Sequence, residues 1–148
     1  MSMKKWMMIL FCFLSVQTAT FAASDTDKPI SVKDLPAVSQ QILTKHFAGK
    51  KVALVKQETE LFDRSYDVIF TNGDKIEFDK AGNWTEIDCK YSKVPAALVP
   101  QAISKYVQSH YPGKTIQQIE KKRKTYEVEL SGGLEITFNS KFQVTEID

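Results

Sequence analysis

Residues 66–88 read YDVIFTNGDKIEFDKAGNWTEID, and residues 126–148 read YEVELSGGLEITFNSKFQVTEID. The two stretches align without a gap at an offset of 60 residues. Nine of the 23 aligned positions are identical, and both stretches end in TEID. Self-similarity at a fixed spacing indicates repeated supersecondary units. The sequence therefore predicts an internal duplication.

A predicted helix precedes each of these stretches. Asp34-Leu35-Pro36 favours a helix start, with Asp34 as the N-cap and Pro36 in the first turn. Apolar residues then recur at helical spacing up to Phe47. Residues 100–113 repeat this pattern at an offset of 64. We therefore expect one repeat at about residues 30–89 and a second at about residues 94–148.

Alternating apolar and polar residues predict four strands after each helix. Asn72-Gly73 and Gly132-Gly133 are typical two-residue hairpin turns. The predicted fold is α+β: tandem α-β4 repeats form one antiparallel sheet of seven to eight strands, with two helices packed on one face. The expected strands are residues 51–57, 65–71, 75–79, 84–89, 115–121, 125–131, 134–139 and 143–147.

The N-terminus predicts export. Lys4 and Lys5 precede an apolar run from Trp6 to Val16, and Thr20-Phe21-Ala22 supplies the small residues of a cleavage site. This pattern is typical of a signal peptide at residues 1–22, cleaved after Ala22; an uncleaved anchor is the alternative. Residues 23–148 then form a single periplasmic or secreted domain without stable membrane insertion.

The charge balance argues against nucleic-acid binding, and the cysteine content excludes an internal disulfide after cleavage. Removing Lys4 and Lys5 leaves 18 of the 20 basic residues against 18 acidic ones. A neutral chain lacks the basic surface of a nucleic-acid-binding protein, and the basic residues 121–124 are interpreted as a solvated turn. Cys89 is the single cysteine after cleavage, so no internal disulfide can form. Strand alternation predicts that Cys89 is buried.

The helix-free face of the predicted sheet is rich in carboxylates. A solvated polar face is the ordinary interpretation of such a surface. Trp84 is the exception, because alternation places this large aromatic among the acids and tryptophan often anchors interfaces. The candidate partner-binding residues are Trp84, Glu86, Asp88, Asp67, Glu77, Glu129 and Glu146.

The repeated motifs resemble a known family. Each helix closes on F-x-G-K or Y-P-G-K, and Y-x-V and I-x-F follow. This pattern is similar to the PepSY-like family of exported bacterial proteins, whose tandem units resemble β-lactamase-inhibitor protein. The resemblance implies a periplasmic location, no demonstrated catalysis, and an inhibitory or chaperoning role. The second copy departs at Phe142 and Val144, where the first has Gly82 and Trp84.

Several functional hypotheses follow. The first is a non-enzymatic binding or inhibitor module that engages an envelope protein or peptide through the helix-free face. The alternatives are a hydrolase using paired carboxylates such as Glu86 and Asp88, or a divalent-metal-binding protein. No catalytic residue, metal ligand or cofactor is assigned. The two sheet edges make a monomer or a weak dimer the expected state.

Overall fold

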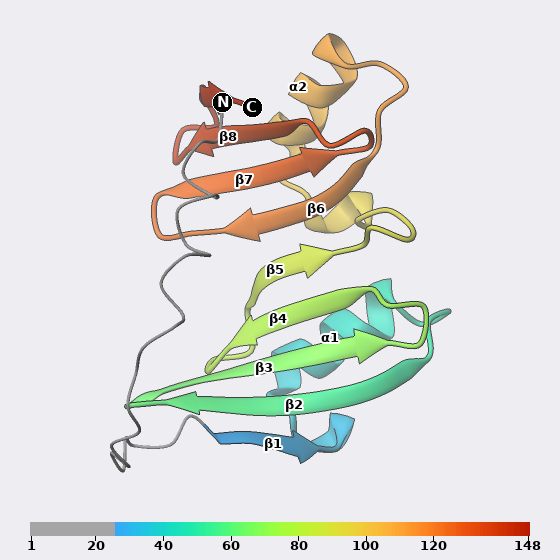
Figure 1. Ribbon diagram of the computed structural model, residues 1–148, viewed down its shortest axis with the longest axis vertical. Helices are drawn as coiled ribbons and strands as arrows, with labels where there is room; N and C mark the ends of the chain where they lie inside the picture. The colour runs from blue at the N-terminus through green and yellow to red at the C-terminus, as the bar shows by residue number, and fades with distance from the viewer. Residues whose placement is uncertain (1–25) are drawn as a thin grey trace, which may run out of the picture.

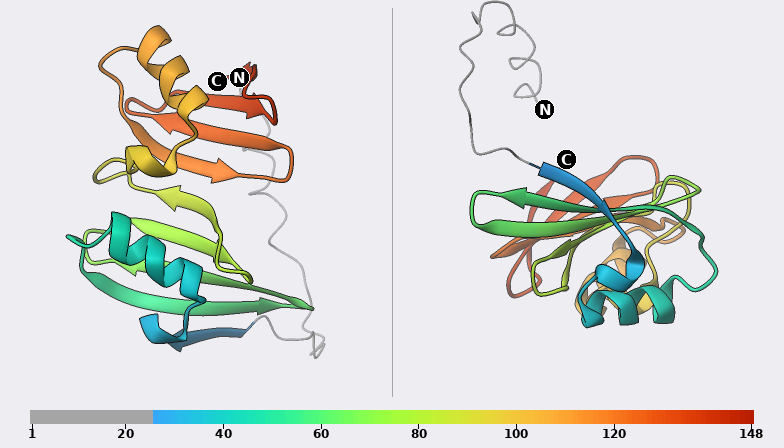
Figure 2. Two further views of the ribbon diagram at one scale, coloured as in Figure 1. Left: turned by 180° about the vertical axis from the view of Figure 1, so that it is seen from behind. Right: turned by 90° about the horizontal axis from the view of Figure 1, so that it is seen from below.

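The structure is a computed structural model that describes residues 26–148, and the predicted signal peptide lies outside these residues. Two helices lie on one face of one antiparallel sheet, and the other face is free of helices (Figures 1 and 2). No helix within residues 26–148 is long and apolar enough to cross a membrane. In chain order the elements are β1 (Thr26–Ile30), the 3-10 helix η2 (Val32–Asp34), α1 (Ala37–His46), β2 (Val52–Glu60), β3 (Asp63–Phe70), β4 (Lys75–Asp79), β5 (Trp84–Asp88), the 3-10 helix η3 (Ala96–Leu98), α2 (Gln101–His110), β6 (Ile116–Lys121), β7 (Thr125–Leu130), β8 (Glu135–Asn139) and β9 (Val144–Ile147).

The sheet has nine strands in the order of the sequence, so the predicted number of seven to eight was wrong. The additional strand is β1, which pairs with β2 at the sheet edge and precedes the predicted first repeat. Its sequence, TDKPI, has no apolar alternation and contains Pro29. Proline is tolerated in an edge strand, where no second neighbour needs its missing N–H.

Each α-helix begins directly after a proline. Pro36 and Pro100 occupy the N-cap positions of α1 and α2. Asp34 was predicted to cap α1, and this was wrong. Its carboxylate instead accepts a 2.9 Å hydrogen bond from the Ser31 backbone N–H, in a capping box on η2. After β1, one α-helix and four strands follow one another twice. That the two halves arose as copies stays a prediction from the sequence.

A row of aliphatic side chains crosses the sheet beneath the helices. Cross-strand pairing joins Val55, Val68, Ile76, Ile87, Ile119, Val128, Ile136 and Ile147, one residue from each of β2 to β9. All except Ile147 are buried, whereas Ile147 on edge strand β9 is 47% exposed. Burial of these side chains against the helices is the main stabilising contribution to the fold.

A short seam between β5 and β6 joins the two halves of the sheet. It contains three residue pairs, among them the buried pair Ile87–Ile119. The backbone N–H of Cys89 extends the seam by donating a 2.7 Å hydrogen bond to the Gln117 carbonyl. As predicted, Cys89 is a buried free cysteine. Burial raises the pKa of its thiol to about 11.

The β4–β5 turn packs directly against α1. Gly82 has a φ of +93°, and the Ser39 hydroxyl donates a 2.9 Å hydrogen bond to its carbonyl. A Cβ at Gly82 would lie 2.6 Å from the Pro36 Cβ. Both the backbone conformation and the close approach therefore require glycine at this position.

Gly82→Ala should destabilise the protein by about 2 kcal/mol, because the methyl group must displace α1 and the backbone adopts a strained φ. Gly49→Ala is the matched control, since a Cβ there meets nothing within 4 Å. Urea unfolding of both variants tests this. Equal stability of the two variants would contradict the packing described here.

Candidate functional site

A row of carboxylates crosses the helix-free face of the sheet. Each of five consecutive strands, β3 to β7, contributes one acid that lies directly opposite the next. We call this set the carboxylate row. It consists of Asp67, Glu77, Glu86, Glu120 and Glu127.

Strand alternation and register together produce this row. The acids precede or follow the buried aliphatic row by one position, so their side chains point to the opposite face. Like charges placed directly opposite one another destabilise a sheet. Lysines relieve the repulsion at both ends of the row: Lys56 Nζ lies 3.7 Å from Asp67 Oδ2, and Lys122 Nζ lies 2.8 Å from Glu127 Oε1. The arrangement therefore concentrates negative charge at a cost in stability.

Burial and mutual repulsion raise the pKa of three of these acids. For Asp67, burial is the first cause and nearby Glu58 adds to it. For Glu77, burial comes first and Asp67 adds to it; for Glu120, burial comes first and Glu86 and Glu127 add to it. Asp67 is 5% exposed, and its Oδ1 has no hydrogen-bond partner. The row consequently holds its negative charge less readily than isolated carboxylates would.

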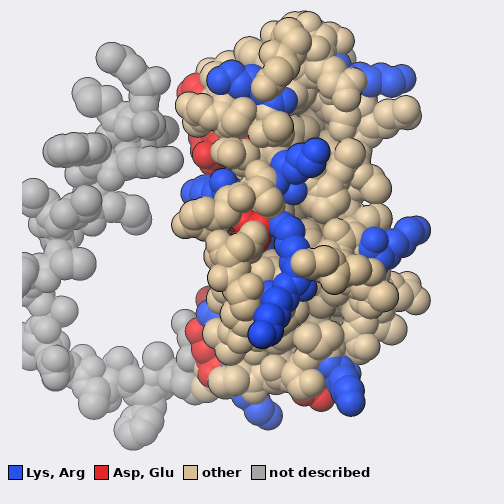
Figure 3. Space-filling model, turned by 90° about the vertical axis from the view of Figure 1, so that its right-hand side faces the viewer, with Lys and Arg blue, Asp and Glu red and all other residues tan. Residues whose placement is uncertain are grey.

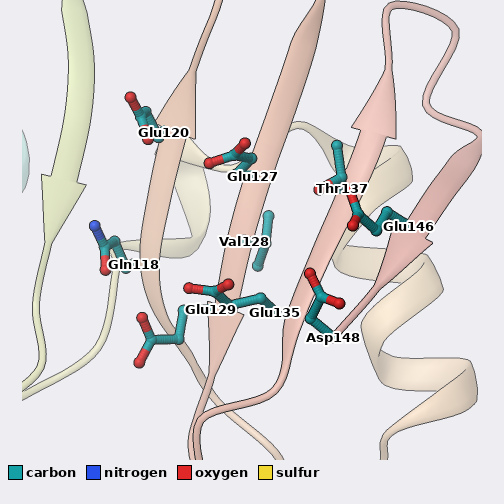
Figure 4. Close-up of a pocket in the computed structure, with 9 residues that line it drawn as sticks. All are labelled: Gln118, Glu120, Glu127, Val128, Glu129, Glu135, Thr137, Glu146 and Asp148. Atoms are coloured by element: carbon teal, nitrogen blue, oxygen red, sulfur yellow. The ribbon is translucent and has the colours of Figure 1, made fainter. Parts of the chain in front are cut away.

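A shallow hollow of about 160 Å³ adjoins the row on the second half of the sheet. Figure 4 shows acidic side chains from β6 to β9 surrounding it. We call this hollow the carboxylate hollow. Its acids are Glu120, Glu127, Glu129, Glu135, Glu146 and Asp148.

Basic groups are scarce around the hollow. Lys122 pairs with Glu127 at 2.8 Å, and both side chains are partly exposed. In Figure 3, acidic side chains gather along the left-hand margin, where the helix-free face lies, and Lys and Arg dominate the side that faces the viewer. Within residues 26–148, no three acidic, His or Cys side chains are grouped closely enough to hold a metal ion without movement.

The structure brings six of the seven predicted site residues to the helix-free face, but not Trp84. A β-bulge in β5 inserts Thr85, so that Trp84 pairs with buried Phe78 instead of lying among the acids. Trp84 packs against the core beside the helices. Its predicted position was therefore wrong, because a bulge shifts the alternation by one residue. Thr85 is the residue that the bulge leaves without a cross-strand partner.

The remaining predicted residues divide between the two acidic features. Asp67, Glu77 and Glu86 belong to the carboxylate row, while Glu129 and Glu146 line the carboxylate hollow. Asp88 lies beside the row, opposite Gln118 across the seam. Two members of the row, Glu127 and Glu120, were not among the predicted site residues. Glu120 is the less obvious of the two. Its position in the TIQQIEK segment indicated a strand, but only the seam register places it opposite Glu86.

A buried polar network around Asp74 was also missed. Asp74 is fully buried and accepts hydrogen bonds from Lys50, Asn72 and Ser92 side chains and from the Tyr91 backbone N–H. Burial acts to raise the pKa of Asp74, but the hydrogen bonds and the Lys50 charge outweigh it and hold the pKa below its usual value. The network ties three loops together. Position 134 in the second half is a leucine, so the sequence offered only this asymmetry as a signal.

Comparison with known proteins identifies the family. The family described as "Putative beta-lactamase-inhibitor-like, PepSY-like" matches residues 64–146, more than half of the chain. The protein belongs to this PepSY-like family, as its motifs indicated. Among curated proteins, none matches the chain.

Solved structures of similar proteins come from Bacteroides. A "putative periplasmic protein from DUF2874 family" of Bacteroides vulgatus is 55% identical, with a TM-score of 0.82, over 84% of this chain and 98% of its own. A "putative calcium-regulated periplasmic protein" of Bacteroides thetaiotaomicron is 50% identical, with a TM-score of 0.81, over 82% and 96%. A third protein, described as periplasmic and of unknown function, from Bacteroides vulgatus, is 40% identical, with a TM-score of 0.78, over 83% and 99%. These relatives support a periplasmic location for this chain.

Asp67→Asn should stabilise the protein at pH 7 by about 1 kcal/mol, because it removes a buried charge whose Oδ1 lacks a partner. The raised pKa of Asp67 means that the folded state retains a proton that the unfolded state releases. Stability should therefore fall as pH rises from the ordinary values of 3.8 for Asp and 4.5 for Glu towards neutrality. The lowered pKa of Asp74 acts only below this window.

Urea unfolding between pH 4.5 and pH 7 measures this dependence. The wild type should lose stability across the range, and Asp67→Asn should lose less. Exposed Glu135→Gln is the control and should follow the wild type. A wild type that gains stability towards pH 7 would contradict this assignment of proton binding.

Proposed function

We propose that the protein is a non-enzymatic periplasmic binding protein that receives a positively charged segment of an envelope protein or peptide on its helix-free sheet face. The carboxylate row is the observation that carries the proposal. Five opposed acids on five strands destabilise the free protein, and a cationic partner would relieve that repulsion. Complementary charge also accelerates association and selects partners.

The geometry of the row suits an extended ligand. Its acids lie on neighbouring strands, so successive carboxylates are separated by about 5 Å along a line that crosses the sheet. Lysine or arginine side chains of one bound segment could reach several of them. The Gln118 side chain donates a 2.7 Å hydrogen bond to Glu86 and so holds that carboxylate at the seam. The row is therefore partly ordered before binding.

A hydrolase is less well supported by the same geometry. Glu86 and Asp88 point to one face, but both are engaged: Glu86 accepts from Gln118, and Asp88 accepts a 3.3 Å hydrogen bond from the Lys90 backbone N–H. The hollows on this face are shallow. General acid–base chemistry instead requires a carboxyl group aimed into a pocket that excludes water.

Glu86→Gln with Glu120→Gln should weaken binding of a lysine-rich peptide about tenfold at low salt, because the variant loses two central charges of the row. Asp34→Asn with Glu60→Gln changes the net charge equally outside the row, at two exposed positions, and should have little effect. Fluorescence anisotropy with a labelled peptide measures both affinities. Equal losses in the two variants would show that net charge, and not the row, governs binding.

Divalent cation binding in the carboxylate hollow is the second candidate. Six carboxylates line this hollow, and oxygen ligands of this kind are those that calcium prefers. One relative is described as calcium-regulated. In this candidate, calcium would draw the surrounding side chains together, since their present spacing does not form a ligand set.

Calcium at about 10 mM should raise the melting temperature of the wild type, because a ligand that binds only the folded state stabilises it. Glu129→Gln with Glu135→Gln should abolish the increase, while Asp27→Asn with Glu60→Gln should retain it. Differential scanning fluorimetry measures the shift, with magnesium as the ionic control. An unchanged wild-type melting temperature would eliminate this candidate.

A further inference from the structure

The tip of the β2–β3 hairpin presents two large apolar side chains to solvent. Leu61 and Phe62 form the two-residue connection after the last strand pair, Glu60–Asp63. Their side chains are 81% and 101% exposed. Figure 1 shows that this hairpin extends past the ends of its neighbours. The two side chains therefore contribute nothing to the core.

The backbone of this tip is unfavourable for its residues. Leu61 has a φ of +51°, a conformation in which a side chain other than glycine costs about 1–2 kcal/mol. Other turns of this sheet place Gly73, Gly82 or Gly133 at positive φ. Phe142 shares this conformation, but its ring packs 5.5 Å from that of Tyr126. Leu61 and Phe62 pack against no such neighbour, so nothing in the molecule offsets the cost of this backbone conformation. We therefore expect their side chains to contact another molecule.

An apolar hollow that could receive the tip lies on the helix side of the second half. It has a volume of about 140 Å³, close to that of an engineered cavity of about 150 Å³ that binds benzene. Lys93 and Lys114 lie at its rim. Its apolar lining comes from Val94, Ala96, Val99, Val107 and Ile116. We call it the α2 hollow.

The charges around the tip and the α2 hollow are complementary. On the helix-free side, the hollow next to the tip is lined by Glu58, Glu60 and Asp63, together with Arg64 and Glu77. The hollow on the other side is lined by Leu61, Phe62, Asp63, Arg64 and Lys80. A favourable contact therefore turns the helix-free side of the tip, where acids predominate, towards Lys93 and Lys114. In Figure 1 the hairpin tip and the loop between β5 and α2 lie on opposite sides of the molecule. One copy therefore cannot fill its own α2 hollow.

We propose that the protein self-associates head to tail, with Phe62 of one copy seated in the α2 hollow of the next. Such a contact uses two different surfaces, so each bound copy still offers a free tip and a free hollow. The association continues beyond a dimer unless the geometry closes a ring. Neither the tip nor the α2 hollow contains a residue of the carboxylate row.

Sedimentation velocity of the chain purified after export tests the proposal over rising concentration, up to about 1 mM. The wild type should form species larger than a dimer. Phe62→Asp should remain monomeric, and Phe62→Ala should weaken association about 30-fold, as expected for a central aromatic anchor. Lys93→Glu with Lys114→Glu should also weaken it, because the rim charge is reversed. Phe62, Lys93 and Lys114 are all exposed, so these variants should fold normally, which circular dichroism checks.

Mixing the variants provides the decisive result. Phe62→Asp retains an intact hollow, and the double lysine variant retains an intact tip. Together they should form a one-to-one heterodimer and nothing larger, because a single compatible contact remains. Thr145→Lys, which places a charge on an exposed residue of edge strand β9, is the control and should associate like the wild type.

Three outcomes would overturn the proposal. A wild type that stays monomeric at the highest concentration rules out self-association through the tip, and the tip would then serve a different partner. Loss of association in Thr145→Lys would assign the contact to pairing of sheet edges. Failure of the mixture to form a heterodimer would overturn the contact between tip and hollow.

Discussion

The three-residue seam between β5 and β6 is the contact on which the rest of the structure depends. Without it, each half would be one helix on a small sheet with two unpaired edges, a form that is rarely stable alone. The seam also makes both the aliphatic row and the carboxylate row continuous across the sheet. On one face it joins Ile87 to Ile119 and so unites the core. On the other it places Glu86 opposite Glu120 and so creates the carboxylate row. Stability and charge density therefore arise from the same pairing.

Much of the fold could be predicted because local patterns determine it. The helical spacing before Phe47 and the Asn72-Gly73 turn depend on residues close in sequence, and both halves show them. β1 could not be predicted in this way, because TDKPI has neither apolar alternation nor high strand propensity. It is a strand because β2 offers an unpaired edge. The error at Trp84 has a related origin: a one-residue bulge inverts the two faces, and periodicity alone does not reveal a bulge.

The acidic surface was only partly predictable for a different reason. Alternation assigns each carboxylate to a face, but cross-strand register decides which carboxylates lie together. Glu120 and Glu86 are far apart in the sequence, and no local motif connects them. Asp74 illustrates the opposite case. It directly follows the Asn72-Gly73 turn, so its sequence context indicates a surface residue. Instead, the Lys50 and Ser92 side chains from distant loops cover it and donate hydrogen bonds to its carboxylate. Long-range contacts thus decide which polar residues are concentrated and which are enclosed.

Cys89 gives the seam an intrinsic reporter. Its backbone N–H belongs to the seam, its side chain is fully buried, and its thiol has a pKa of about 11. Because the thiolate is the reactive form, modification at an appreciable rate requires exposure to solvent. The alkylation rate of this single thiol in residues 26–148 therefore reports how often the structure opens at this end of the seam. Modification of Cys89 thus monitors local unfolding beside the three residue pairs that join the two halves of the sheet.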